Sequence, residues 1–411
     1  MVTTLETEEL NFVEKIIRRR SINTVLHPIC SLVHQKVIGY EALSRGEWEG
    51  REISPYVLFK EALEKGKVLE LDRLCREKAL YFFSSRAGNG PDGPLLFLNI
   101  DTSILTRTTV GSDSFRKLVK AAGLEPERIV IEILESRTDD EKSLVDFVNR
   151  YRDLGFKIAL DDVGMGSSNL DRIPLLRPSV VKIDRYLVDG MHREMYKRAV
   201  FRGLTDIAHE VGAMVVAEGI EKEEDAIACL EDGADGIQGF FFSKPESDLD
   251  SLNTKCREKL FNLARNFRLY SIEALNRRKE RTLKQNTVFT HLAYKLEKSY
   301  GNTVFLELFE EVKGKNENLE CFYILDSYGI QLSPTVGLED WNKRGGFFGP
   351  AEKGSDHGMK RYYISLASGL KKFVSEPYLS SATGKVCQTL AGFFRYGHQD
   401  CVLCIDFSFE A

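Results

Sequence analysis

Acidic and amide side chains stand at the ends of apolar, strand-like runs in the first 245 residues of the chain. The run VIGY stops at Glu41, for example, and KIAL stops at Asp161 and Asp162. The polar residues of this kind are Glu41, Asn99, Glu132, Asp161, Asp162, Lys182, Asp184, Glu218 and Gln238. A single acid at such a place is usually a cap or a loop salt bridge, but the repetition predicts a shared site.

Carboxylates gathered at one place repel one another and raise one another's pKa values. Divalent cations remove that conflict, and a set of oxygen ligands without histidine or cysteine favours Mg²⁺ or Mn²⁺ over zinc. Lys182 is the lone lysine of the set. Near two metals, a lysine can orient an attacking water or offset the charge that develops on phosphoryl oxygens. The pattern therefore indicates hydrolysis of a phosphate ester.

About eight apolar runs alternate with helix-permitting stretches between residues 24 and 245, and these elements must position the polar residues. The runs are continuously apolar, which suits parallel strands buried on both faces. The first two, TVLHPICSLV and KVIGYEAL, follow each other without a helix and predict a hairpin. We expect an α/β fold, a TIM-like (β/α)8 barrel with an irregular first hairpin, in which all strand ends meet in one ring. No GxGxxG turn supports a dinucleotide-binding Rossmann site.

The rest of the chain predicts a long helix and a second domain. Residues 246–300 contain neither glycine nor proline, and a 3-4-3-4 apolar spacing indicates a coiled-coil-like stripe suited to a partner helix. The residues of that stripe are Leu260, Leu263, Phe267, Tyr270 and Ala274. Later segments predict hairpins around Asp326 to Gly329 and around SSATG, with a short helix, as in a small α+β domain. We divide the chain into a barrel (1–247), a linker helix (248–300) and the smaller domain (301–411).

Composition narrows the classes of partner. The net charge is −5, with 57 basic and 62 acidic residues, which argues against a nucleic-acid polymer as partner. No apolar stretch approaches the roughly 18–20 residues that span a bilayer, and the acidic start predicts no signal peptide, so we expect a cytoplasmic protein without a membrane partner. The eight scattered cysteines suggest reduced thiols. Cys401 and Cys404 fit opposite faces of a strand better than half of a metal site.

The ordered motifs EAL, LNID, IEILE, LDDVG, VKID, AEGIE and IQGFFFSKP resemble those of the EAL domain family over residues 20–247. Members of that family are phosphodiesterases that hydrolyse cyclic di-GMP to linear pGpG with Mg²⁺ or Mn²⁺. The resemblance implies that Glu41, Asn99, Glu132 and Asp161 hold one metal and that Asp161, Asp162 and Glu218 serve the second.

The same resemblance implies further roles. Lys182 assists the bridging water, Glu218 is the candidate general base, and Glu221 and Gln238 complete the inner shell. Leu43 and Arg45 touch the nucleotide, with Arg45 on a phosphate. Glu135 braces the loop 163–169, which departs from the family's usual DDFGTGYSSL at Val163, Met165, Ser167 and Asn169. These changes bear on loop order, on the affinity for the second metal and on dimer coupling.

The C-terminal half resembles, more loosely, a PAS/Cache-like domain of the YkuI type. It implies a homodimer and a sensor or dimerisation module with a possible small ligand. The main hypothesis is a phosphodiesterase regulated by this domain. There are two alternatives. One is a catalytically weak receptor for cyclic di-GMP that signals through the helix, and the other is an interaction scaffold.

Overall fold

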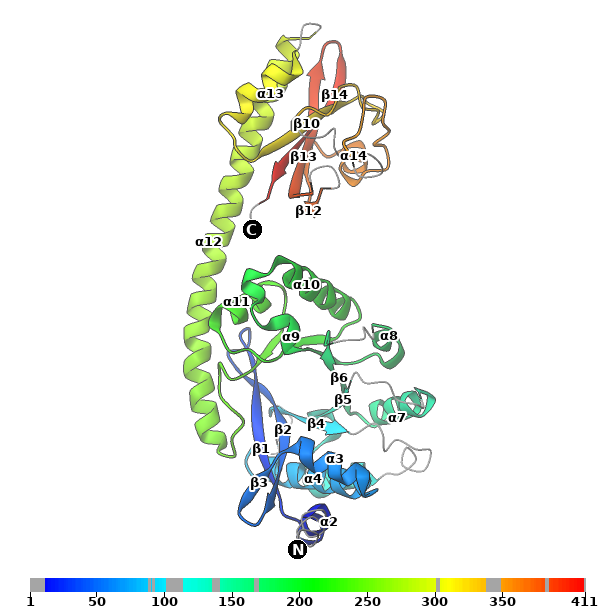
Figure 1. Ribbon diagram of the computed structural model, residues 1–411, viewed down its shortest axis with the longest axis vertical. Coiled ribbons are helices and arrows are strands. Elements are labelled where there is room, and N and C mark those ends of the chain that lie inside the picture. The colour runs from blue at the N-terminus through cyan, green and yellow to red at the C-terminus, as the bar shows by residue number, and fades with distance from the viewer. Residues whose placement is uncertain are drawn as a thin grey trace, which may run out of the picture. The chain divides into compact units, whose positions relative to one another are not determined.

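The computed structural model of the protein describes residues 12–87, 90, 93–100, 114–134, 141–165, 170–300, 304–337, 349–380 and 384–409. Its internal contacts divide the chain into two units, Met1–Ser271 and Ile272–Ala411. The first unit is an α/β barrel and the second is a smaller domain built on one sheet (Figure 1). The long helix that the sequence predicts as a separate linker is shared between the two units.

Eight strands close the barrel in the order β1-β9-β8-β7-β6-β5-β4-β2, and β2 returns to β1. Strand β1 is antiparallel to both of its neighbours, whereas the other neighbours are parallel. The predicted barrel and its first hairpin are thus confirmed. A short strand, β3, extends β2. The strands are β1 (Ile22–Ser31), β2 (Lys36–Trp48), β3 (Arg51–Ile53), β4 (Leu95–Ile100), β5 (Ile129–Leu134), β6 (Lys157–Val163), β7 (Val180–Ile183), β8 (Met214–Ala217) and β9 (Gly236–Gln238).

Helices cover the outside of the barrel, as Figure 1 shows for α4, α7 and α10. Their inner faces supply large apolar side chains, such as Phe83, Phe147 and Phe201, to the main core of the unit. The helices are α2 (Phe12–Arg19), α3 (Pro55–Glu64), α4 (Val68–Ser84), α6 (Ser114–Ala121), α7 (Glu141–Asp153), α8 (Arg172–Leu176), α9 (Arg185–Val188), α10 (Met195–Glu210) and α11 (Glu223–Glu231), with 3₁₀ turns η2 (Pro126–Arg128) and η3 (Met191–Arg193).

Helix α12 (Leu249–Lys298) begins against the barrel of its own chain. Leu252, Cys256, Leu260 and Leu263 are fully buried in the barrel core, and Phe267 packs at its edge. The prediction that this stripe faces a partner helix is therefore wrong. Helical spacing shows that a helix has an apolar face, but it does not show which element covers that face.

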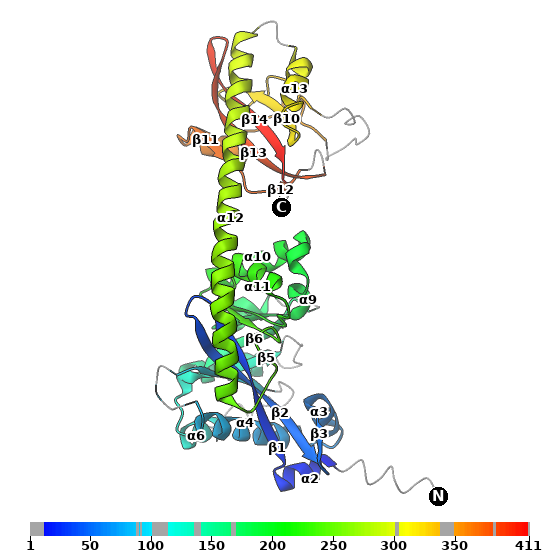
Figure 2. The same cartoon turned by 90° about the vertical axis from the view of Figure 1, so that its left-hand side faces the viewer.

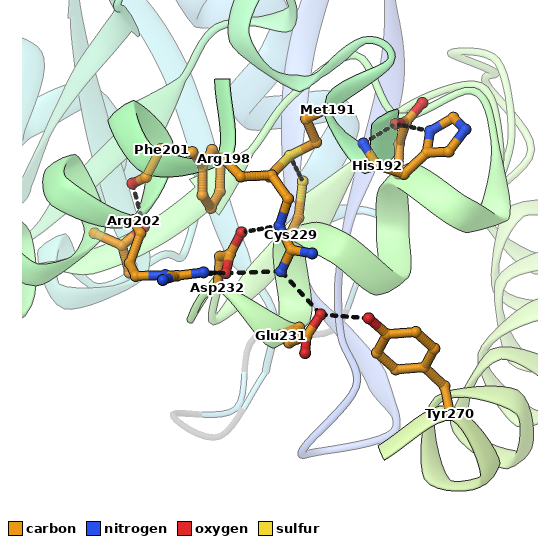
Figure 3. A network of polar contacts seen from close by, with 11 residues as sticks. Met191, His192, Arg198, Phe201, Arg202, Cys229, Glu231, Asp232 and Tyr270 are labelled. Carbon is orange, nitrogen blue, oxygen red and sulfur yellow. Dashed lines mark hydrogen bonds and ion pairs between the residues drawn. The ribbon is translucent and has the colours of Figure 1, made fainter. Parts of the chain in front are cut away.

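Side-chain hydrogen bonds also fix α12 to the barrel, among them the following three. Tyr40 lies 2.5 Å from Asn253, Asn266 lies 2.5 Å from Glu223, and the Tyr270 hydroxyl lies 2.6 Å from Glu231. Figure 2 shows α11 beside α12, and Figure 3 shows Tyr270 directed at Glu231 next to the Arg198 guanidinium. Because Tyr40 precedes Glu41 on β2, α12 is bonded to the strand that carries a candidate metal ligand.

The second unit is an antiparallel sheet in the order β10-β14-β13-β11, with β12 paired to β13. The C-terminal half of α12 and the helix α13 lie on one face of this sheet (Figure 2). Val288, Leu292 and Leu296 of α12 and Leu308 and Phe309 of α13 belong to the core cluster on that face. Cys401 and Cys404 belong to the clusters on opposite faces of the sheet, as expected for one strand. The elements are α13 (Phe305–Lys313), β10 (Leu319–Leu325), α14 (Arg361–Ala367), β11 (Lys372–Val374), β12 (Tyr378–Leu379), β13 (Val386–Tyr396) and β14 (Gln399–Ser408).

One predicted strand of this unit does not form. After the turn that follows β10, the chain pairs with β10 through isolated bridges, from Leu325 to Gln331 and from Phe322 to Val336, and Ile330 bridges to Asp356. Pro334 lies between Gln331 and Val336 and has no N–H to donate, which prevents a continuous ladder. The tip of the predicted SSATG hairpin lies outside the described residues, but β12 and β13 pair on either side of it.

None of the helices in the described part of the chain contains an apolar stretch long enough to cross a bilayer.

Candidate active site

A layer of apolar side chains fills the inside of the barrel. It contains Ile29, Phe97, Val130, Ala159, Val180 and Val216 from six strands. On β2 and β9 the equivalent residues are glycines. A Cβ on Gly39 would lie 2.6 Å from a ring carbon of Phe97, so the phenyl ring takes the space that a side chain would need. This close approach explains the glycine that precedes Tyr40 and Glu41.

Two positions from each residue of this layer, the next inward-facing side chain is polar. Each of the eight barrel strands contributes one such polar residue, either within the strand or directly after its last residue. We call these eight residues the polar ring. Its members are His27, Glu41, Asn99, Glu132, Asp161, Lys182, Glu218 and Gln238. Seven of them are residues that the sequence singles out, and the structure brings those seven together.

Lys182 occupies the middle of the polar ring. Its Nζ lies 2.5 Å from Glu132, 2.6 Å from Glu218, 2.8 Å from Asp161 and 3.7 Å from Glu41. Lys182 is 1% exposed and the Glu132 residue is fully buried. Burial alone would lower the pKa of Lys182, but the four carboxylates outweigh it and raise this pKa, so the ammonium stays charged. A buried charge of this kind is tolerated only because it is paired.

The carboxylates of the ring differ in their affinity for protons. Burial raises the pKa of Glu132 well above its ordinary range and that of Glu218 to about 8, although Lys182 opposes both shifts. Glu41 is the exception. Burial raises its pKa, but the charge of Lys182, with hydrogen bonds from Gln238 and Asn99, opposes burial, and the pKa of Glu41 is lowered. At neutral pH, Glu41 is therefore ionised while Glu218 holds a proton.

A β-bulge brings two consecutive acids to the same site. Successive residues of a regular strand point to opposite faces, so Asp161 and Asp162 should diverge. The pairing of β6 with β7 shifts between Leu160 and Val163, however, and Asp162 has a left-handed φ of 56°. Both aspartates and Glu218 consequently offer oxygens within 4.8 Å of one another. Burial and the charge of Asp161 raise the pKa of Asp162 to about 6.

The donor atoms fit a hard divalent cation. Asp161, Asp162 and Glu218 are a group of three carboxylates that could hold a metal ion. Oε2 of Glu132 and Oε1 of Gln238 are buried without a hydrogen-bond partner. Buried oxygens without partners are costly, and an ion of the Mg²⁺ type would satisfy them. The polar ring can therefore hold divalent metal.

Three other predicted residues lie outside this ring. Glu221 pairs with Arg185 at 2.7 Å, with both side chains about half exposed. Arg45 lies 3.3 Å from Glu52. Asp184 caps α9 by accepting a hydrogen bond from the Tyr186 amide. Glu135, like Ser167 and Asn169 of the altered loop, lies outside the described residues.

A cavity of about 310 Å³ opens beside the ring, between the ends of β2 and β4 and helices α3 and α4. Leu43 and Asn99 line it next to the ring, and Tyr56, Phe59 and Asp72 line the helix side. Asp72 is paired with Arg76. Sequence reasoning missed these helix residues because an amphipathic helix is normally interpreted as core packing. It missed His27 because β1 runs the opposite way, so its polar residue lies inside the apolar run and not at the end of the run.

Metal binding by this ring should depend on pH. The proton on Glu218 must leave before the carboxylate can bind a cation. The pKa of Glu218 is about 8 in the folded protein and 4.5 ordinarily. At a pH between these two values, the folded, metal-free protein keeps the proton, whereas the unfolded chain has lost it. Metal-free stability should then fall as the pH rises through this window, while Mn²⁺ affinity rises. Calorimetric titration of Mn²⁺ in two buffers of different ionisation enthalpy checks this. An affinity that is constant from about pH 6 to 8, with no proton released, would contradict it.

The fold and the polar ring define an α/β barrel protein whose strand ends build an oxygen-rich cation site. The chain belongs to the EAL domain family, which it matches over residues 11–245. It is 32% identical over 223 residues to YkuI of Bacillus subtilis, an EAL-domain containing protein, with 53% of each chain covered. It is 28% identical over 235 residues to PdeB of Escherichia coli, a probable cyclic di-GMP phosphodiesterase, covering 56% of this chain and 44% of PdeB. The chain thus spans about half the length of these curated relatives.

Solved structures show the same fold. YkuI of Bacillus subtilis, crystallised with its substrate c-di-GMP and calcium, matches 97% of this chain and 99% of its own, with a TM-score of 0.79 at 24% identity. BlrP1 of Klebsiella pneumoniae, in a complex with calcium and cyclic di-GMP, matches 56% of this chain and 57% of its own, with a TM-score of 0.51 at 26% identity. The match to YkuI extends over both units.

Proposed function

We propose that the barrel hydrolyses cyclic di-GMP to linear pGpG with two Mg²⁺ or Mn²⁺ ions. The observation that carries this proposal is the polar ring, in which one buried lysine and four carboxylates meet while further oxygens lack partners. A ring that served only as structure would not need buried oxygens without partners. Membership of the EAL domain family and the named activity of PdeB support the choice of substrate.

The ligands divide into two groups that share Asp161. Glu41, Asn99, Glu132 and Asp161 would hold one ion, and Asp161, Asp162 and Glu218 the other. When bound, the ions supply Lewis-acid activation of water and neutralise charge at the phosphate. Glu218 would first lose the proton that its raised pKa retains in the metal-free protein, and its carboxylate could then take a proton from water as a general base. Lys182 donates hydrogen bonds to the water or to a phosphoryl oxygen.

The cavity beside the ring suits one guanine of the substrate. Tyr56 and Phe59 can contact the flat face of a base, and the Asp72 carboxylate can accept from the N–H groups on the guanine edge. Leu43 lies at the border between cavity and ring. Arg45 would turn from Glu52 to a phosphate, for which a guanidinium is well suited. Glu221 stays a prediction from the family pattern.

A receptor that binds cyclic di-GMP without turnover is the second candidate. The feature that favours it is the altered loop after Asp162, where Val163 is buried and Met165 is 64% exposed. A receptor has no physical need for a general base or for Lys182, however, and the polar ring contains both. We therefore prefer the enzyme.

The choice of metal separates the enzyme from the receptor. We expect hydrolysis with Mg²⁺ or Mn²⁺ and little with Ca²⁺, because Ca²⁺ takes more ligands at about 2.3–2.6 Å and would misplace the attacking water. The measurement is the rate of cyclic di-GMP loss with each metal, with nucleotide binding measured in parallel. Equal rates with Ca²⁺ would contradict the two-metal mechanism, and binding without loss under all three metals would favour the receptor.

We further propose a cytoplasmic homodimer in which the second unit is a PAS/Cache-like sensor that tunes the barrel through α12. The hydrogen bond between Asn253 and Tyr40, next to Glu41, supports this route because a movement of α12 would be felt at a ring residue. Coupling requires two states that a small ligand of the second unit favours unequally.

Removing the second unit tests its role. The truncated chain should end at Ser271, since a cut at residue 302 would leave Val288, Leu292 and Leu296 without the sheet that covers them. We expect a change of at least about twofold in turnover, with the folded state checked by circular dichroism and the oligomeric state by light scattering. An unchanged rate in a truncated chain of the same oligomeric state would leave the second unit as an assembly module.

A further inference from the structure

His27 is the member of the polar ring that no sequence pattern marks. It lies on β1 directly opposite Glu41, and two residues from Ile29 of the apolar layer. On its other side, β1 pairs with β9, and Nδ1 of His27 lies 2.8 Å from Nε2 of Gln238. His27 therefore contacts one ring residue and faces another across the strand pair.

The neighbours of Gln238 fix the orientation of its amide. Nε2 lies 2.7 Å from Oε2 of Glu41, and only a donor can face a carboxylate at that distance. The same nitrogen faces His27 Nδ1, which accepts if the amide donates to both neighbours. The proton of the neutral imidazole is then on Nε2, which is buried without a hydrogen-bond partner of its own. Both amide hydrogens are then used. Oε1 of Gln238 remains, buried and without a partner.

We propose that His27 is a positioning residue that holds the Gln238 amide so that its oxygen is presented to the cation site. The inference rests on the proposed function, which places divalent metal in the ring. The last torsion of a glutamine is broad, so Glu41 alone would leave the amide free to turn. Two acceptors at fixed places define its plane. An amide oxygen held in this way serves Mg²⁺ or Mn²⁺ directly or through a water, and partners of this kind orient metal ligands in general.

The alternative is that His27 only fills space against Phe240, whose ring centroid is 6.0 Å away. Two substitutions of nearly equal shape separate these roles. His27→Asn places an acceptor oxygen where Nδ1 stood, whereas His27→Leu places a methyl group there. Both lose the rest of the imidazole and so share the same packing cost.

The experiment measures Mn²⁺ affinity by electron paramagnetic resonance on the full-length chain without nucleotide. We expect His27→Leu to weaken binding by about 10–100-fold, as outer partners of metal sites generally do, and His27→Asn to recover most of the loss. His192→Ala is the control, because His192 is a histidine of the same barrel whose partner, Asp225 at 2.6 Å, lies on helix α11 and not in the polar ring. Figure 3 shows His192 near the Met191 and Cys229 side chains. The His192→Ala protein should bind Mn²⁺ normally. Circular dichroism confirms folding, and His27→Ala replaces the leucine variant if that one does not fold.

A double-mutant cycle then asks whether His27 acts through Gln238. If it does, His27→Leu should add little to the loss already caused by Gln238→Ala. Equal affinities of the asparagine and leucine variants, or losses that simply add, would overturn the proposal. Because the readout is metal binding, the result stands apart from the proposed reaction: a protein that binds Mn²⁺ in this pattern but leaves cyclic di-GMP intact would refute the hydrolase and keep the role of His27.

Discussion

Lys182→Met is expected to stop turnover and to destabilise the metal-free barrel by roughly 3–5 kcal/mol, the usual cost of removing one partner from a buried ion pair. Lys182 lies within 2.5 to 2.8 Å of three carboxylates, so its loss leaves them facing one another without a counter-charge. For a unit of this size the melting temperature should fall on the order of 10 °C. The loss should grow as the pH rises, because the crowded acids hold protons in the folded state that the unfolded chain releases.

Metal should reverse the loss of stability but not the loss of turnover. Mn²⁺ can replace the missing positive charge, so the melting temperatures of the variant and the natural protein should converge in its presence. Lys120→Met, at an exposed position of α6, is the control and should change neither property. A metal-free Lys182→Met protein as stable as the natural one would show that the lysine does not balance the ring, and turnover at the normal rate would remove it from the reaction.

Glu41→Gln should reduce turnover by more than about 100-fold and lower stability far less than Lys182→Met does. Even outer partners of a metal site cost 10–100-fold, and Glu41 is assigned as a direct ligand. Its carboxylate is the farthest of the four from Lys182, at 3.7 Å, so removing its charge takes less from the ion-pair network than removing the lysine does. Because its pKa is lowered in the folded protein, the charge contributes some stability, which the glutamine variant loses. The different effects on stability distinguish the ligand from the counter-ion.

Turnover and thermal melting of the Glu41→Gln protein decide the assignment. Glu47→Gln changes an exposed glutamate on the same strand and should leave both measurements unaltered. A Glu41→Gln protein that turns over at the natural rate would contradict its role as a ligand. One that melts well below the natural protein would show that Glu41 mainly supports the fold.

Most of the polar ring could be predicted because the parallel strands of a barrel end at one edge. Polar residues that end successive apolar runs must then lie close together, and this reasoning is sufficient for Glu41, Asn99, Glu132, Asp161, Lys182, Glu218 and Gln238. It fails for His27, since β1 is antiparallel and carries its polar residue inside the apolar run, between Leu26 and Ile29. The sequence did not predict that Asp161 and Asp162 converge, because their convergence depends on a β-bulge that no residue type in this segment indicates.

Features that depend on contacts far apart in the sequence were less predictable. The spacing of Leu260, Leu263 and Phe267 predicts a helix with one apolar face, and α12 has such a face. The spacing does not show whether that face packs on a partner helix or on the outside of the barrel. In the structure it packs on the barrel. The helix side of the cavity, with Tyr56 and Phe59, is likewise defined only when α3 and α4 meet the strand ends.

The most direct test of the central claim is the identity of the product formed from cyclic di-GMP by the full-length protein with Mn²⁺. Mass spectrometry should show linear pGpG, heavier than the substrate by one water, and Lys182→Met protein treated in the same way should form none. Recovery of unchanged cyclic di-GMP from the natural protein, at metal and nucleotide concentrations shown to saturate binding, would contradict the account and leave a nucleotide receptor in its place.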